Sequence, residues 1–82
     1  MIARLRCLVP GCRRTLKPEN PEDDQGICSK HWRLTDQRLR KLYRRCRRVE
    51  RIEPGRRDHA IEVGTRVWGK LTIQAIERSM GL

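Results

Sequence analysis

Two pairs of potential metal ligands near the N-terminus constrain the fold of this chain more than any other feature. Four residues separate Cys7 from Cys12, and a second pair, Cys28 and His31, begins after fifteen more residues. Thiolate and imidazole groups are the ligands of tetrahedral zinc sites, and zinc modules bring them together as two close pairs. The spacing therefore predicts one structural zinc ion held by Cys7, Cys12, Cys28 and His31.

The residues within each pair suit this role. Pro10 presets one backbone dihedral of a tight turn, and Gly11 tolerates the left-handed conformation that such a turn requires. Cys28 and His31 lie three residues apart, so they share one face of a first helical turn, whose N-terminus favours a thiolate. A knuckle followed by ligands at a helix start is the treble-clef arrangement. Four protein ligands also close the coordination shell, so we expect a structural ion.

Two other interpretations of the cysteines remain open. They could be ordinary buried thiols, or Cys7 and Cys12 could form a disulfide. The sequence has no visible signal peptide and no apolar run long enough for a membrane span, so we expect an intracellular protein whose thiols stay reduced. Cys46 belongs to neither pair and is predicted to be a small core residue.

Positive charge is concentrated in the middle of the chain. The sequence carries 20 Lys/Arg and 10 Asp/Glu, which gives a formal net charge of +10. Residues 33–57 contain eleven Lys/Arg and three Asp/Glu, whereas residues 58–82 contain three of each. This distribution favours a binding surface for a polyanion. Nucleic acid is the first candidate, and an anionic membrane surface or an acidic protein are alternatives.

The basic segment also has helical periodicity. Its apolar residues fall within an arc of about 80° on a helix: Leu39, Leu42, Cys46 and Val49. Thr35 and Asp36 are good N-cap residues, and Pro54-Gly55 would end the helix, which predicts a helix over 36–53. The opposite face is predicted to contact phosphates through Arg40, Lys41, Arg44, Arg47, Arg48 and Arg51, with Arg38 and Arg45 flanking it.

This basic face has a simpler interpretation as a solvated helix surface. However, like charges four residues apart destabilise a helix by about 0.2–0.5 kcal/mol per pair, and the arginines repeat that spacing. Arginine also forms forked hydrogen bonds with phosphate better than lysine does, and arginines far outnumber lysines here. Both observations favour an anionic partner.

The last segment, residues 58–80, fits two secondary structures. A helical rhythm of three and four residues runs through Ile61, Gly64, Trp68, Leu71 and Ala75, but apolar residues also alternate as in a strand. We prefer a helix that begins at an Asp58 N-cap and packs antiparallel to the basic helix. Three apolar residues lie outside the main stripe of this helix: Ile73, Ile76 and Met80. They would pack on the zinc module or, in a homodimer, on a second copy of the chain.

Part of the chain resembles the small zinc-finger proteins of phages and prophages. The resemblance covers about the first half, including the basic helix, and its specific positions are Cys7, Cys12, Cys28, His31 and Trp32. Many of these proteins place a proline soon after the tryptophan, where this chain has Thr35-Asp36. The resemblance implies zinc binding and a phage or bacterial origin, and hence the cytoplasm of a bacterial host.

Together these features predict a small, zinc-stabilised, mainly α-helical single domain over 1–82. A treble-clef-like zinc module (1–34) would precede an antiparallel helical pair formed by a basic helix (35–53) and a turn with a packing helix (54–82). Trp32 is expected to cover the zinc site, with base stacking as the alternative.

The function predicted from these features is non-enzymatic nucleic-acid binding, with DNA expected ahead of RNA. A module that docks on an acidic host protein is the second hypothesis. A nuclease of the HNH type is disfavoured, because His59 is the one histidine outside the zinc site.

Overall fold

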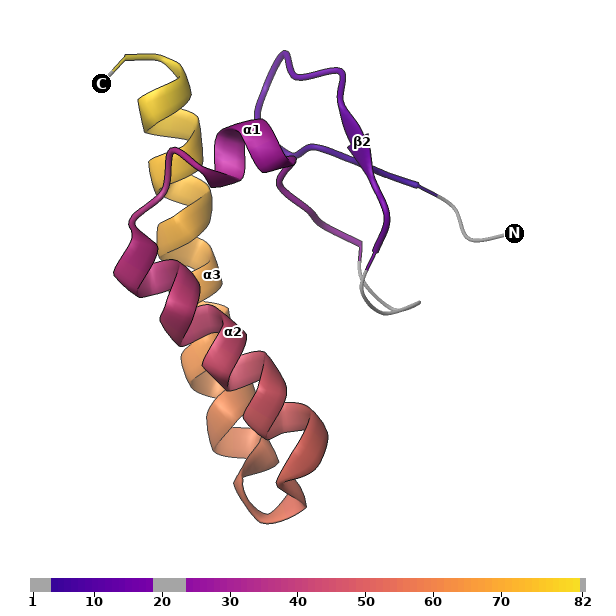
Figure 1. Ribbon diagram of the computed structural model, residues 1–82, viewed down its shortest axis with the longest axis vertical. Coiled ribbons are helices and arrows are strands. Elements are labelled where there is room, and N and C mark those ends of the chain that lie inside the picture. The colour runs from indigo at the N-terminus through magenta and orange to yellow at the C-terminus, as the bar shows by residue number, and fades with distance from the viewer. Residues whose placement is uncertain (1–3, 19–23, 82) are drawn as a thin grey trace.

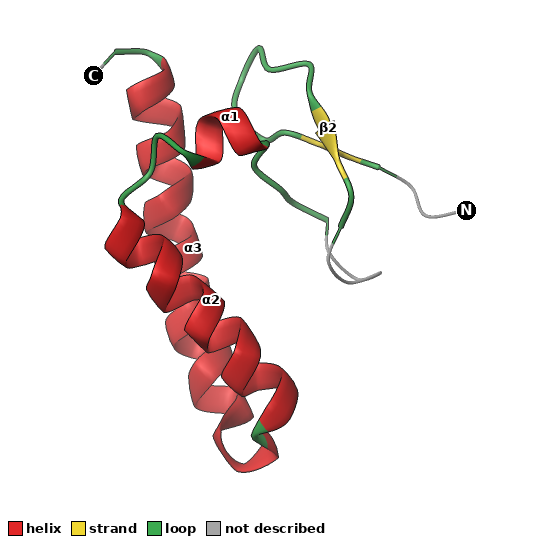
Figure 2. Cartoon of the chain, viewed as in Figure 1, coloured by secondary structure: helices red, strands yellow, loops and turns green. Residues whose placement is uncertain are grey.

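A short β-hairpin and a one-turn helix precede a long helical hairpin, as the computed structural model in Figure 1 shows for residues 4–18 and 24–81. Strand β1 (Leu5–Arg6) pairs antiparallel with β2 (Thr15–Leu16), with Leu5 opposite Leu16. Helix α1 (Ser29–Trp32) leads to α2 (Gln37–Ile52), and the 3-10 turn η1 (Pro54–Arg56) leads to α3 (Arg57–Ser79). The prediction of a mainly helical protein is confirmed, and Figure 2 shows how little strand it contains.

The break between α1 and α2 lies where the sequence predicts it. The Asp36 carboxylate accepts a hydrogen bond from the Arg38 backbone N–H at 2.8 Å, which caps the first turn of α2. The buried Thr35 hydroxyl donates to the Trp32 carbonyl at 2.6 Å. These two side chains satisfy backbone groups that the end of one helix and the start of the next leave without partners.

Helix α3 packs antiparallel to α2, and its C-terminal end extends past the start of α2 (Figure 1). Two contacts define the register. A Cβ atom built on Gly64 would lie 3.4 Å from the Cys46 Cβ, and the Asp36 backbone N–H donates to the Gln74 side chain at 2.8 Å. Small residues in α3 permit this close approach, and its buried positions follow spacings of four, three, four and four: Ala60, Gly64, Val67, Leu71 and Ala75. The prediction of a helix here is confirmed.

Two details of this helical pair differ from the sequence predictions. Asp58 is not an N-cap, because the 3-10 turn runs directly into α3 and places Asp58 within the first turn. The buried face of α2 is also rotated from the predicted apolar stripe. Leu42 is 40% exposed, whereas Tyr43 is partly buried. Cys46 is buried, as predicted.

All three aromatic residues of the chain meet where the N-terminal module joins the helical pair. The ring of Trp32, from α1, lies 6.2 Å from that of Tyr43 in α2 and 6.3 Å from that of Trp68 in α3. Tyr43 and Trp68 are 5.3 Å apart, and the Trp68 indole donates to the Gln25 side chain at 3.0 Å. Such edge-on and tilted ring pairs add about 0.5–1.5 kcal/mol each beyond the burial of their area. The cluster therefore links all three helices.

The apolar residues outside the main stripe of α3 have different environments. Ile76 packs against the cluster that contains Cys7, Val9, Ile27 and Cys28, so one of the three contacts the N-terminal module as predicted. Ile73 and Met80 are 56% and 64% exposed. Within the described residues, no helix combines the length and the apolar character needed to cross a membrane.

Replacement of Leu71 by alanine should strongly destabilise the helical pair, because its side chain is fully buried. We expect a loss of about 2–4 kcal/mol in the free energy of unfolding, measured by urea titration with circular dichroism. Ile73→Ala in the same helix is the matched control and should change stability by less than about 0.5 kcal/mol. Equal effects of the two substitutions would contradict this packing.

Candidate metal centre

The first ligand pair is shaped by a tight turn over residues 9–12. The Cys12 backbone N–H donates to the Val9 carbonyl at 3.1 Å, and Gly11 has a φ of +82°. A proline at the second position and a positive φ at the third define a type II turn, as Pro10 and Gly11 predict. The turn brings the two cysteines to one side of the knuckle.

The second ligand pair lies at the start of α1. Cys28 occupies the N-cap position, and its backbone N–H donates to the Cys7 thiol sulfur at 3.3 Å. This bond crosses between the two segments. Two further contacts join the same two segments: an isolated parallel bridge between Cys7 and Gly26, and a hydrogen bond from the Leu8 N–H to the Gly26 carbonyl at 2.9 Å. Backbone hydrogen bonds therefore hold the knuckle against the α1 start.

The four ligand atoms converge with spacings close to those of a tetrahedral zinc site. The atoms all lie within 4.8 Å of one another. Two thiolates each about 2.3 Å from zinc are about 3.8 Å apart, and a thiolate and an imidazole nitrogen are about 3.6 Å apart. The Cys12 and Cys28 sulfurs are 3.8 Å apart, and the Cys7 sulfur is 3.6 Å from His31 Nδ1. A third distance, from the Cys28 sulfur to His31 Nδ1, is 3.2 Å.

The environments of the two buried cysteines differ. Burial raises the pKa of the Cys7 thiol, although the backbone N–H groups of Cys28 and Val9 oppose the shift. Burial also acts to raise the pKa of the Cys28 thiol. Hydrogen bonds from the His31 backbone N–H, the neighbouring thiols and the Lys30 N–H together outweigh burial, so the Cys28 pKa is lowered. A metal ion bound to both sulfurs would supply the charge that keeps them deprotonated.

This donor set can hold one metal ion and has the ligand chemistry of zinc. All four cysteines are free, so the alternative of a Cys7–Cys12 disulfide is not found. Ordinary buried thiols would not need a histidine nitrogen among them. His31 faces the thiols through Nδ1, which leaves Nε2 on the far side of the ring.

The predicted phosphate-binding residues fall into two groups. Most of them lie on the exposed side of α2: Arg38, Lys41, Arg44, Arg45, Arg48 and Arg51. This set includes Arg38 and Arg45, which were expected only to flank the phosphate-binding face. Arg40 and Arg47 are instead partly buried, because the packing face is rotated toward Tyr43. The Arg40 Nε atom is buried without a hydrogen-bond partner.

Three further cations lie beside the metal centre and were not singled out from the sequence. Arg13 and Arg14 directly follow the Cys12 ligand, and Lys30 directly precedes the His31 ligand. Their adjacency to ligands is a signal that sequence analysis could use, because a bound metal fixes the backbone on both sides of each ligand.

No family model, no curated protein and no solved structure matches this chain in the comparisons with known proteins. The functional interpretation therefore rests on the residues and their geometry.

Loss of one ligand should abolish metal binding. We expect the wild-type chain to bind one Co²⁺, detected by the visible absorption of tetrahedral cobalt thiolate, and to exchange it for Zn²⁺. Cys12→Ser should lose this spectrum, whereas Cys46→Ser should retain it at the same stoichiometry, because Cys46 lies in the interface between α2 and α3. An unchanged spectrum in Cys12→Ser would contradict the assignment.

The positive φ of Gly11 permits a test of the turn alone. A Cβ atom at this position would meet no atom within 4 Å, so the strain of Gly11→Ala would be purely conformational. We expect the zinc-bound protein to be destabilised by about 1–2 kcal/mol in thermal unfolding. Gly69→Ala also meets no atom within 4 Å, but this residue lies within α3, so stability should rise by about 0.5–1 kcal/mol. The same sign for both variants would argue against the turn.

Proposed function

We propose that the chain is a non-enzymatic, zinc-stabilised protein that binds nucleic acid through the exposed side of α2. The observation that carries this proposal is the charge on that side. Its six cations are accompanied by no acidic residue, since Glu50, the one acidic residue between Gln37 and Ile52, lies among the partly buried positions. Ion pairs within the described residues join Arg56 to Glu53 and Arg66 to Glu62, and neither pair involves these six cations.

Several like charges on one helix face are electrostatically unfavourable in the isolated protein. Arg44 and Arg48 lie about one turn apart, as do Lys41 and Arg45, so their like charges repel. Phosphates would relieve this repulsion, and each contact would release counterions from the nucleic acid. Duplex DNA is the first expected target, because its backbone presents a regular array of phosphates to a straight helix face.

A structural role for the metal supports a non-enzymatic function. A Cys3His set occupies all four positions of a tetrahedral zinc ion and leaves none for an activated water. Within residues 4–18 and 24–81, this set is the one group of His, Cys and acidic side chains able to hold a metal. His59 is exposed in the first turn of α3, and this end of the helix is remote from the knuckle (Figure 1).

Docking on an acidic protein remains the second candidate. The exposed apolar side chains of Ile73 and Met80 on α3 favour it, because a protein partner would bury them and nucleic acid would not. Binding measurements with nucleic acid distinguish the two candidates directly.

The proposed function predicts strongly salt-dependent binding. We would measure fluorescence anisotropy of a labelled duplex with the zinc-loaded protein at several salt concentrations. The logarithm of affinity should fall with the logarithm of salt concentration at a slope of about −0.9 per phosphate contacted. Replacement of Arg44 and Arg48 by alanine should weaken binding at least tenfold and reduce the slope by about two.

The control for this variant removes the same formal charge from another surface. Arg56→Ala with Arg66→Ala removes two exposed arginines that already pair with Glu53 and Glu62. Its effect on affinity should be several-fold smaller than that of the α2 variant. Equal losses would indicate a response to net charge alone, and no binding by the wild-type protein would refute the proposed function and favour a protein partner.

A further inference from the structure

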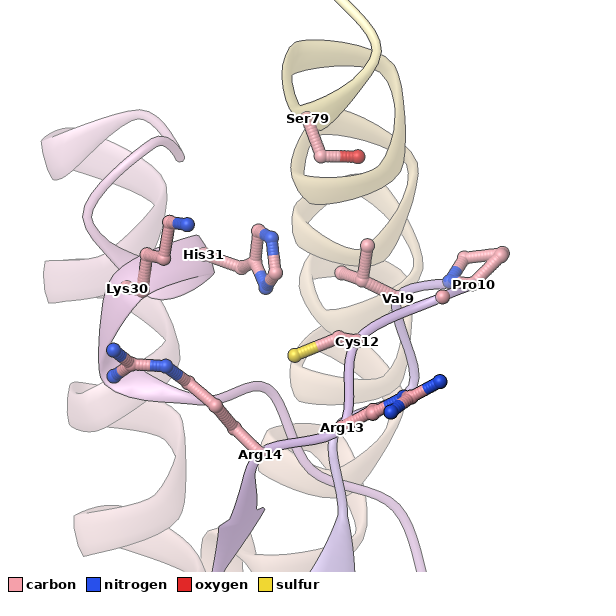
Figure 3. Close-up of a pocket in the computed structure, with 9 residues that line it drawn as sticks. Val9, Pro10, Cys12, Arg13, Arg14, Lys30, His31 and Ser79 are labelled. Atoms are coloured by element: carbon pink, nitrogen blue, oxygen red, sulfur yellow. The ribbon is translucent and has the colours of Figure 1, made fainter.

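A cationic pocket lies beside the metal centre and is separate from the exposed side of α2. It has a volume of about 430 Å³, opens to solvent, and is lined by residues of the knuckle turn, of α1 and of the end of α3 (Figure 3). Arg13 and Arg14 come from the knuckle, Lys30 and His31 from α1, and Ser79 from α3. This volume lies within the roughly 300–1,000 Å³ that is typical of sites for small molecules.

The charge of this pocket selects an anion. Arg13, Arg14 and Lys30 are exposed, and none of them forms an ion pair with another described residue. No acidic residue is among the described residues that line the pocket. A zinc ion with three thiolates carries one net negative charge, which the three cations outnumber. In Figure 3 the Arg14 side chain extends from the knuckle toward α1 on the side of Lys30, and Arg13 extends to the opposite side.

His31 adds a hydrogen-bond donor of fixed orientation. Its Nδ1 atom lies 3.2 Å from the Cys28 sulfur and 3.6 Å from the Cys7 sulfur, which identifies Nδ1 as the ligating nitrogen. A neutral imidazole that binds metal through one nitrogen carries its proton on the other. In Figure 3 one ring nitrogen faces the Cys12 sulfur and the other faces the wall formed by the end of α3.

We infer that this pocket binds a phosphate group of the nucleic-acid backbone, with Arg14, Lys30 and the His31 Nε2–H as its ligands and Arg13 as a nearby cation. The inference rests on the proposed function, and it adds a second contact point to the exposed side of α2. The Ser79 hydroxyl is not a donor to this phosphate, because it donates to the Ile76 carbonyl at 2.7 Å.

A backbone phosphate is favoured over a free phosphate compound by the surroundings of the pocket. Its cations are exposed surface residues, and along the chain Lys30 is followed by the exposed Arg33 and then by Arg38 at the start of α2. A polyanion that follows this path would meet cations from the pocket to the basic helix. Such an extended arrangement suits a polymer better than a single small anion.

The test compares three double variants of the full, zinc-loaded chain in the anisotropy assay with a labelled duplex. Replacement of Arg14 and Lys30 by alanine should weaken binding roughly five- to tenfold and reduce the salt slope by about one, as expected for one lost phosphate contact. The Arg56→Ala, Arg66→Ala protein is the charge-matched control. The Arg44→Ala, Arg48→Ala protein reports on the α2 surface. Cobalt spectra establish that all variants retain the metal site.

The outcomes separate the pocket from the proposed function. If the wild-type protein binds the duplex and the α2 variant is weakened, but the Arg14, Lys30 variant matches the control, the pocket inference is wrong and the proposed function stands. If the wild-type protein binds no nucleic acid, both are wrong.

A second measurement tests the role of His31 without altering a metal ligand. The ¹⁵N–¹H signal of its Nε2–H should shift and exchange more slowly with solvent when a short oligonucleotide is added. Inorganic phosphate at the same phosphate concentration should have a much smaller effect. An unchanged signal at saturating oligonucleotide would remove His31 from the pocket ligands, and an equal response to inorganic phosphate would identify a free anion as the occupant.

Discussion

The convergence of four ligands on one point is the constraint on which the N-terminal third of this protein depends. Its described residues, 4–18 and 24–32, form two strands of two residues each and a single helical turn, and few of them are buried: Cys7, Val9, Gly26, Ile27 and Cys28. Two of these are themselves ligands. So little apolar area cannot offset the entropy of ordering a loop-rich segment. Metal coordination would supply the missing free energy, because binding to a site absent from the unfolded chain is itself folding free energy.

The aromatic cluster connects the N-terminal module to the helical pair. Trp32 directly follows the His31 ligand, so a metal that fixes α1 also fixes the indole beside Tyr43 and Trp68. The hydroxyl of Thr35 and the carboxylate of Asp36 then define where α2 begins. The position of α2 relative to the N-terminal module therefore depends on contacts that start at the metal centre.

Local features of this fold could be predicted from the sequence, whereas features set by contacts between distant segments could not. Each ligand pair, the Pro10-Gly11 turn and the Asp36 cap depend on residues a few positions apart, so spacing and residue type are sufficient. The rotation of α2 depends on the surface of α3, where Gly64 admits Cys46 and Trp68 packs against Tyr43. The cationic pocket could not be predicted for the same reason, since residues of three separate elements line it.

The two cationic surfaces depend on different parts of the fold. The exposed side of α2 is a property of a helix whose other side packs on α3, and that packing contains no metal ligand. The pocket exists only where the knuckle and α1 are held together by their backbone hydrogen bonds, which a bound metal ion would reinforce. If both surfaces contact phosphates as proposed, metal loss would remove the pocket contact first and leave the helix contacts weakened but present. The metal would then determine how many phosphates the protein engages, and the arginine helix would determine whether it binds at all.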